Sequence, residues 1–153
     1  MTDEFENYLS GIAELSAEEV NFSVQFFKSK HVKKGEFFIR ENEVCRDIGF
    51  ISVGAVKAYA IDEDGNENIT CFKFENEFVT SFSEFVSQEK SRRSIRAIED
   101  TVIYTIGYLD YQQLTDQVTA WNSVIKSVME KEYIQKERYM LSYNNKSALD
   151  LSL

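Results

Sequence analysis

Few side chains in this sequence could bind a metal or take part in catalysis. There is a single histidine, His31, and the two cysteines, Cys45 and Cys71, form no Cys-x-x-Cys pair. That set is too small for a His-rich metal centre or an iron–sulfur cluster. No Gly-x-Ser-x-Gly, P-loop or Gly-x-Gly-x-x-Gly stretch occurs. The sequence therefore predicts no metal site, no catalytic constellation and no enzyme.

The basic cluster Lys90-Ser91-Arg92-Arg93 is the clearest candidate for binding chemistry. A guanidinium group favours a phosphate or carboxylate partner, so the cluster could face an anion. A loop of solvated charges is the equally weighted alternative, and a short nucleic-acid patch is a further one. The chain holds 17 Lys and Arg against 26 Asp and Glu, a net charge of −9. That balance argues against a nucleic-acid binder, which needs clustered positive charge.

The elements that must position this cluster change in type along the chain. Residues 1–29 predict two helices, because Phe5, Tyr8, Leu9 and Ile12 form an amphipathic stripe and a capping box starts at Ser16. Residues 30–107 predict short strands joined by turns, including a hairpin around Asp62–Asn66 and a strand over residues 92–98. Short strands at this spacing indicate a sandwich or barrel.

The last part of the sequence predicts helices again, a short one from residue 108 and a longer one over about 119–143. Residues 108–143 are therefore taken as a helical segment and residues 144–153 as a frayed tail. The 153 residues fit one domain. The acidic amino-terminal segment is no signal peptide, and no window has the apolar length of a membrane span. Together with two cysteines that we expect to be reduced, this predicts a cytoplasmic protein without a membrane partner.

Three short motifs in order resemble the cyclic-nucleotide-binding domain of the Crp/Fnr transcription regulators. They are Lys34-Gly35-Glu36 after the first strand, Gly54-Ala55-Val56-Lys57-Ala58-Tyr59, and Asp64-Gly65-Asn66-Glu67. The resemblance covers about residues 10–143. It implies a mainly β fold, a jelly-roll barrel (double-stranded β-helix) with amino-terminal helices and a long helix after the barrel that forms a homodimer. Trp121, Ile125, Val128 and nearby side chains are then expected to face the second copy in part.

Asn42 and Asn76 stand where this family often has glycine. Asparagine tolerates the left-handed backbone conformation better than most residues do. We therefore expect both turns to survive the substitution.

The resemblance also implies a pocket for a small anionic ligand. In nucleotide-binding members, a Gly-Glu stretch and a later Arg-Ser or Arg-Thr hold the cyclic phosphate. Aligned without gaps, these positions fall on Thr80-Ser81 and Ser91; a small loop shift places Ser83-Glu84 and Arg92 or Arg93 there, and Arg93-Ser94 repeats the family's dipeptide. Without glycine the backbone cannot approach a phosphate as closely. A pocket altered for another small ligand, or empty, is therefore favoured over ordinary cyclic AMP binding.

The resulting prediction is a non-enzymatic regulatory domain that senses a small ligand and passes the signal through its long helix. The alternative is the same barrel with a degenerate pocket, used only for dimerisation. Only about ten residues follow Tyr143, too few for the family's helix-turn-helix. The chain as given is expected not to bind an operator directly. A truncated regulator, a frame-disrupted one and a stand-alone sensor all stay open.

Overall fold

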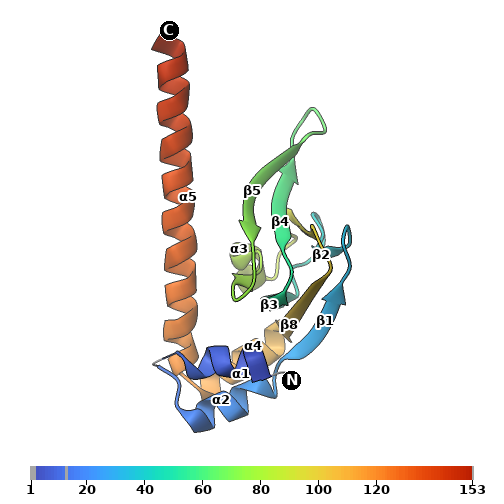
Figure 1. Ribbon diagram of the computed structural model, residues 1–153, viewed down its shortest axis with the longest axis vertical. Helices are drawn as coiled ribbons and strands as arrows, with labels where there is room; N and C mark the ends of the chain where they lie inside the picture. Colours follow the sequence, from blue (N-terminus) through green and yellow to red (C-terminus); the bar gives the residue numbers. More distant parts are fainter. Residues whose placement is uncertain (1–2, 13, 153) are drawn as a thin grey trace.

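Two antiparallel four-stranded sheets form a jelly-roll barrel, with short helices at its foot and one long helix alongside (Figure 1). The computed structural model describes the backbone of residues 3–12 and 14–152, and the side chains of residues 4–12, 14–138 and 141. One sheet has the strand order β1-β8-β3-β6 and the other β2-β7-β4-β5. The predicted fold class, a jelly-roll barrel with amino-terminal helices and a long helix after it, is confirmed.

Along the described part of the chain, two helices precede the strands, one helix lies between β6 and β7, and two helices follow β8. The strands are β1 (Lys28–Val32), β2 (Phe37–Ile39), β3 (Asp47–Val53), β4 (Val56–Ile61), β5 (Glu67–Lys73), β6 (Phe78–Val79), β7 (Ser94–Ala97) and β8 (Thr101–Gly107). The helices are α1 (Asp3–Ser10), α2 (Ala17–Val24), α3 (Phe82–Ser87), α4 (Tyr108–Gln117) and α5 (Ala120–Ser152).

Helix α2 begins at the predicted capping box. The Glu19 amide donates to the Ser16 hydroxyl at 3.2 Å, and the Glu19 carboxylate accepts from the Ser16 amide at 2.9 Å. Two amides that the first helical turn leaves without partners are thereby satisfied. This fixes where the chain turns beneath the barrel.

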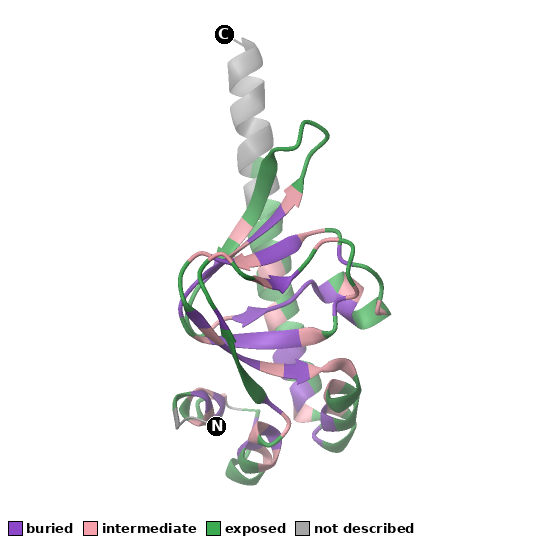
Figure 2. Ribbon diagram, turned by 90° about the vertical axis from the view of Figure 1, so that its right-hand side faces the viewer, coloured by how far each residue is buried: buried purple, intermediate pink, exposed green. Residues whose placement is uncertain are grey.

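An aromatic cluster joins α1 to the foot of the barrel. The fully buried Phe5 ring lies 4.7 Å from Phe27, 5.0 Å from Phe50 and 5.2 Å from Tyr104, measured between ring centroids. Aromatic pairs at these separations add to the free energy of burial. Buried residues fill the barrel and the foot of α5, whereas the β4–β5 hairpin and the middle of α5 are exposed (Figure 2).

The turns adopt the backbone conformations that their residues predicted. Asn42 and Asn76 have φ values of 70° and 67°, so asparagine does take the left-handed conformation at both sites. In the β4–β5 hairpin, Gly65 has φ 84° and the Asp62 carboxylate accepts from the amides of Asp64 and Asn66. These bonds close the hairpin at its predicted place.

Three element boundaries differ from the sequence prediction. Strand β1 starts at Lys28 because it pairs with β8 from Lys28↔Thr105 onward, so the ladder sets its beginning. Strand β7 starts only at Ser94, which leaves both arginines of the basic cluster in the preceding loop. Helix α5 continues to Ser152, past the predicted end at residue 143 and through most of the predicted tail.

Candidate ligand-binding site

A cavity of about 800 Å³ lies between the barrel and the long helix α5. Its walls come from β5, from α3, from the loop over residues 89–93 and from α5. Segments far apart in the sequence thus share one cavity, and a molecule bound there would contact both the barrel and α5. A site of this size accommodates a small organic ligand.

Five of the seven predicted ligand residues line this cavity: Ser81, Ser83, Glu84, Arg92 and Arg93. The other two, Thr80 and Ser94, are buried and form hydrogen bonds within the chain. The Thr80 hydroxyl donates to the Asp47 carbonyl at 2.8 Å, and the Ser94 hydroxyl accepts from the Glu41 amide at 3.0 Å. Thr80 and Ser94 therefore hold the walls together rather than lining the cavity.

The loop over residues 89–93 is held to the β2–β3 turn. The Asn42 amide donates to the Ser91 carbonyl, and the Ser91 amide donates to the Glu43 carbonyl, both at 2.8 Å. The Ser91 hydroxyl, almost fully buried, donates to the Arg93 carbonyl at 2.6 Å. Ser91 thus shapes the loop, and Arg92 and Arg93 beside it line the cavity.

The Arg93 guanidinium lines the cavity and contacts only neutral oxygens. It donates to the Thr70 hydroxyl at 3.4 Å and to the Thr80 carbonyl at 3.3 Å, both neutral acceptors. Among the side chains that the structure describes, no carboxylate lies within 4.0 Å of it. A guanidinium with only long bonds to neutral oxygens retains donors for an anion.

Glu84 is already engaged by the loop. Its carboxylate accepts from the Arg92 amide at 3.0 Å. An acceptor that binds the protein's own backbone is less available to a ligand hydroxyl. Glu84 therefore fits a role in fixing the loop at least as well as a role in ligand contact.

An ion pair links the barrel to α5 inside the cavity. The Lys73 ammonium, at the end of β5, lies 2.8 Å from the Glu132 carboxylate on α5 and 3.6 Å from Glu77. Burial lowers the pKa of Lys73, but the hydrogen bond and charge of Glu132, with the charges of Cys71 and Glu77, raise it by more. Lys73 therefore stays protonated and can pair with an anion.

Sequence reasoning missed the half of the cavity that β5 and α5 supply. Thr70, Cys71 and Lys73 come from β5, and Glu132, Tyr133 and Lys136 come from α5. The strand and the helix were both predicted, but their sequence patterns do not tell which face of the helix packs against which face of the strand. One feature of the sequence pointed to this half of the cavity. Because side chains alternate between the two faces of a strand, Lys73 falls on the same face of β5 as Cys71.

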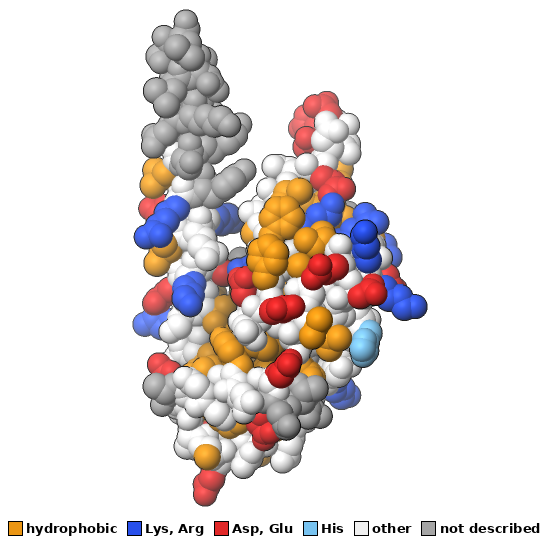
Figure 3. Space-filling model, viewed as in Figure 1, with side chains coloured by type: hydrophobic (Ala, Val, Ile, Leu, Met, Phe, Trp, Pro, Cys, Tyr) orange, Lys and Arg blue, Asp and Glu red, His pale blue; other side chains and the backbone are white. Residues whose placement is uncertain are grey.

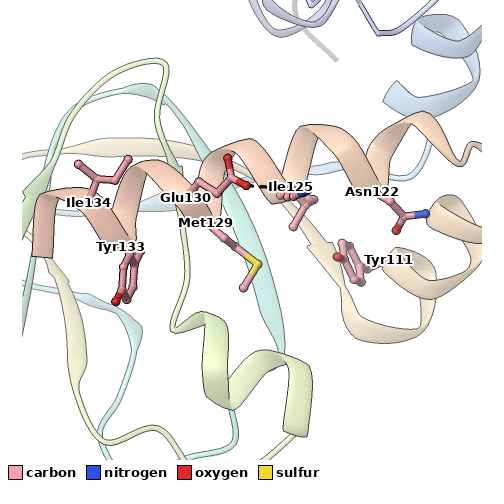
Figure 4. A pocket seen from close by; sticks show the side chains of 8 residues that line it. Tyr111, Asn122, Ile125, Met129, Glu130, Tyr133 and Ile134 are labelled. Carbon is pink, nitrogen blue, oxygen red and sulfur yellow. Dashed lines mark ion pairs between the residues drawn. The ribbon is translucent and has the colours of Figure 1, made fainter. Parts of the chain in front are cut away.

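A second, more open groove of about 520 Å³ runs along α5. In Figure 4, Ile125, Met129 and Tyr133 project from α5, and Tyr111 reaches the groove from α4. Tyr133 lines both this groove and the cavity. Met129 and Ile134, which both line this groove, are 41% and 46% exposed.

The three residues expected at a dimer interface also contact the chain's own core. Trp121 is 2% exposed, and its indole nitrogen donates to the Ser23 hydroxyl of α2 at 2.8 Å. Ile125 is buried, and Val128 packs partly buried against the same core. Trp121 has almost no surface left for a second copy, because α2 and the barrel already cover its ring.

The remaining candidates for metal or redox chemistry lie apart from one another. His31 is exposed on β1, as a surface strand residue would be. Cys45 is buried and Cys71 half-buried, and both are free thiols; burial raises the pKa of Cys45. Within the described residues, no three His, Cys, Asp or Glu side chains come together as a metal site. None of the described helices has the length and apolar character to cross a bilayer.

A jelly roll of two antiparallel four-stranded sheets, with amino-terminal helices and a long helix after it, is the fold of cyclic nucleotide-binding domains. Comparison with protein families agrees: the cyclic nucleotide-binding domain pattern matches residues 29–118, more than half of the chain. The chain belongs to this family. Domains of this family are typically regulatory and non-catalytic.

Distant sequence relatives are Crp/Fnr-type regulators. The chain is 26% identical over 121 residues to the transcriptional activator protein anr of Pseudomonas aeruginosa and to the Anr protein of Pseudomonas protegens. Each match covers 79% of this chain and 49% of the relative. The chain thus spans about half the length of these curated relatives.

Solved structures share the fold at lower identity. The catabolite activator protein of Thermus thermophilus superposes with a TM-score of 0.74 at 15% identity, covering 87% of this chain and 61% of that one. The sensor domain of the transcriptional regulator DNR from Pseudomonas aeruginosa gives 0.70 at 15% identity, covering 87% and 91%. The predicted Crp/Fnr resemblance is confirmed at the level of family and fold.

Proposed function

We propose that this chain is a sensor domain that binds a small anionic ligand between the barrel and α5 and transmits its presence through α5. One observation carries the proposal: Arg93 lines a cavity whose opposite wall is α5, and its guanidinium meets only neutral oxygens. The transcriptional activators among the relatives support a role in the regulation of transcription. A cyclic nucleotide is the first ligand to test, because the family is named for it.

The ion pair of Lys73 with Glu132 gives the ligand a way to act on α5. A ligand can shift an equilibrium only if it binds the two arrangements with different affinity. An anion beside Arg93 would compete with Glu132 for the Lys73 ammonium, which lines the same cavity. A bound ligand would thus weaken the ion pair between β5 and α5, and α5 could then change its position.

The ligand proposal predicts a specific defect in the Arg93→Ala variant. Calorimetric titration with cyclic AMP, cyclic GMP and other nucleotides should give binding to the wild type and at least about tenfold weaker binding to the variant, because a charge-assisted bond is lost. Arg46→Ala is the matched control, since Arg46 is exposed and does not line the cavity. Equal affinity in wild type and Arg93→Ala would contradict the proposal.

A second function, dimerisation without a ligand, is favoured by the state of Glu84. Its carboxylate already binds the Arg92 amide, and no glycine lies in the stretch that would approach a phosphate. In that case no nucleotide would bind the wild type, and the protein would still self-associate. The same titration, combined with the measurement below, separates the two functions.

In either function α5 is the proposed homodimer contact, through its exposed apolar residues. Sedimentation velocity should show a wild-type dimer, whereas Met129→Glu with Ile134→Glu should give a monomer, because burying two carboxylates in an apolar interface is costly. Val53→Glu is the control, an exposed apolar residue at the end of β3. A wild type that stays monomeric at the highest concentration would refute the α5 dimer.

A further inference from the structure

The outer face of the β2-β7-β4-β5 sheet carries a continuous row of cations and aromatic rings. Strand register places Phe37 of β2 opposite Arg96 of β7, Arg96 opposite Lys57 of β4, and Lys57 opposite Phe72 of β5. Directly opposed residues in an antiparallel sheet project from the same face. With Arg40, which lies beside Phe37, these five residues form what we call the cation–aromatic row. It crosses all four strands of the sheet.

Phe37 holds two guanidinium groups at one end of the row. The central guanidinium carbons of Arg40 and Arg96 lie 4.2 Å and 5.2 Å from the centre of its ring. Arg96 is further fixed by a 2.7 Å hydrogen bond from its Nε to the Gly35 carbonyl. A guanidinium stacked on a ring still offers its edge N–H groups for paired hydrogen bonds. The row therefore presents pre-oriented donors.

The positive charge of the row is poorly neutralised by the chain itself. Lys57 pairs with Glu67 at 2.6 Å, but among the described side chains no carboxylate lies within 4.0 Å of Arg40 or Arg96. Like charges directly opposite one another, as in Lys57 and Arg96, destabilise a sheet. A carboxylate brought by another molecule would relieve this repulsion. The chain as a whole has a net charge of −9, so the cations of the row differ in sign from the overall charge.

The other end of the row exposes apolar surface. Phe72 and Phe74 are 47% and 53% exposed, and β5 is one of the two edge strands of its sheet. Figure 3 shows hydrophobic side chains on this face of the barrel beside a cluster of Lys and Arg. Aromatic residues and arginine are enriched in protein interfaces, and exposed aromatic groups serve as anchors there.

These features select an acidic peptide segment over a nucleic acid. Two guanidinium groups already lie over the Phe37 ring, so the ring offers little room for a stacked base. The net charge of −9 repels a polyphosphate but tolerates a short segment with a few carboxylates. A protein segment can also supply an apolar side chain for Phe72 and Phe74, which a phosphate backbone cannot.

We propose that the cation–aromatic row is a docking site for an acidic protein segment that carries at least one large apolar side chain. Carboxylates of the segment bind the edges of Arg40 and Arg96, and its apolar residue rests on Phe72 and Phe74. This surface is distinct from the cavity at α5, since none of the five residues of the row lines that cavity. Docking there does not depend on the proposed ligand function.

The test uses a display library of random twelve-residue peptides, selected on the full chain. Selected peptides should be rich in Asp and Glu with Phe, Leu or Trp. Fluorescence anisotropy of the best peptide should show at least about tenfold weaker binding to Arg40→Ala, with an unchanged unfolding temperature. Arg96→Lys, which keeps the charge but loses the guanidinium fork, should also weaken binding.

Lys28→Ala with Arg46→Ala is the charge control, since it removes positive charges exposed at the other sheet. This control should change the peptide affinity by no more than about twofold. If net charge alone drove binding, the control would weaken it as much as the variants of the row do. Selection of peptides without acidic residues, equal losses in the control, or an oligothymidine that binds more tightly than the best peptide would each overturn the proposal.

Discussion

Trp121→Ala should unfold at a far lower denaturant concentration than the wild type. The Trp121 ring is 2% exposed and lies between Phe27 and Phe78, with centroid separations of 6.0 Å and 6.4 Å. Truncating a buried aromatic side chain to alanine costs about 3–5 kcal/mol. For a domain of this size that corresponds to a fall in the unfolding temperature of roughly 10 °C. Circular dichroism in urea and on heating measures both quantities.

Two further substitutions separate the packing of Trp121 from its hydrogen bond. Ser23→Ala removes the acceptor of the indole N–H and leaves a buried donor unpaired, at a cost of about 1–3 kcal/mol. Trp121→Phe loses the same bond but keeps part of the ring, so its loss should lie between those of Ser23→Ala and Trp121→Ala. If Trp121→Ala were as stable as the wild type, α5 would not be anchored on α2 as the structure has it.

Gly54→Ala should be the second severe substitution, although it adds only one methyl group. Gly54 has φ 104°, and a Cβ there would lie 2.7 Å from both the Asp100 carbonyl oxygen and the Thr101 Cα. Backbone atoms cannot rotate aside as a side chain can. The unfavourable φ and the overpacking together should cost about 3 kcal/mol.

Gly65→Ala is the matched control for Gly54→Ala. Gly65 also has a positive φ, 84°, but a Cβ there would meet no atom within 4 Å. It should therefore cost only the conformational part, about 1 kcal/mol. Unfolding of both variants can be followed by the fluorescence of Trp121, the single tryptophan of the chain. If both variants lost a similar free energy of unfolding, the close approach of β8 to Gly54 would not be the reason that this position needs glycine.

The parts of the fold that short-range interactions specify could be predicted from the sequence. The capping box at Ser16 and the Asp62–Asn66 hairpin involve residues a few positions apart. The left-handed turns at Asn42 and Asn76 depend on the residue itself. Such signals are complete within a few residues of sequence.

The candidate site could be predicted only in part, because long-range packing decides which groups meet. Arg93 was expected near a ligand and lines the cavity, but Ser94, the next residue, bonds to the Glu41 amide instead. Trp121 was expected at an interface between copies. An apolar helical stripe does not by itself tell which surface covers it. The structure shows that α2 and the barrel cover it within one chain.

The sequence by itself determined an acidic jelly-roll domain with a long helix, with too few metal ligands and no known catalytic motif. Tertiary structure alone decided that Lys73 meets Glu132 across the cavity and that Arg96 and Lys57 stand opposite one another on the barrel. The physical reason is the same in both cases. Local sequence fixes backbone conformation and which residues share a face, whereas the partner of that face is set by the register of the strands and the packing of the helix.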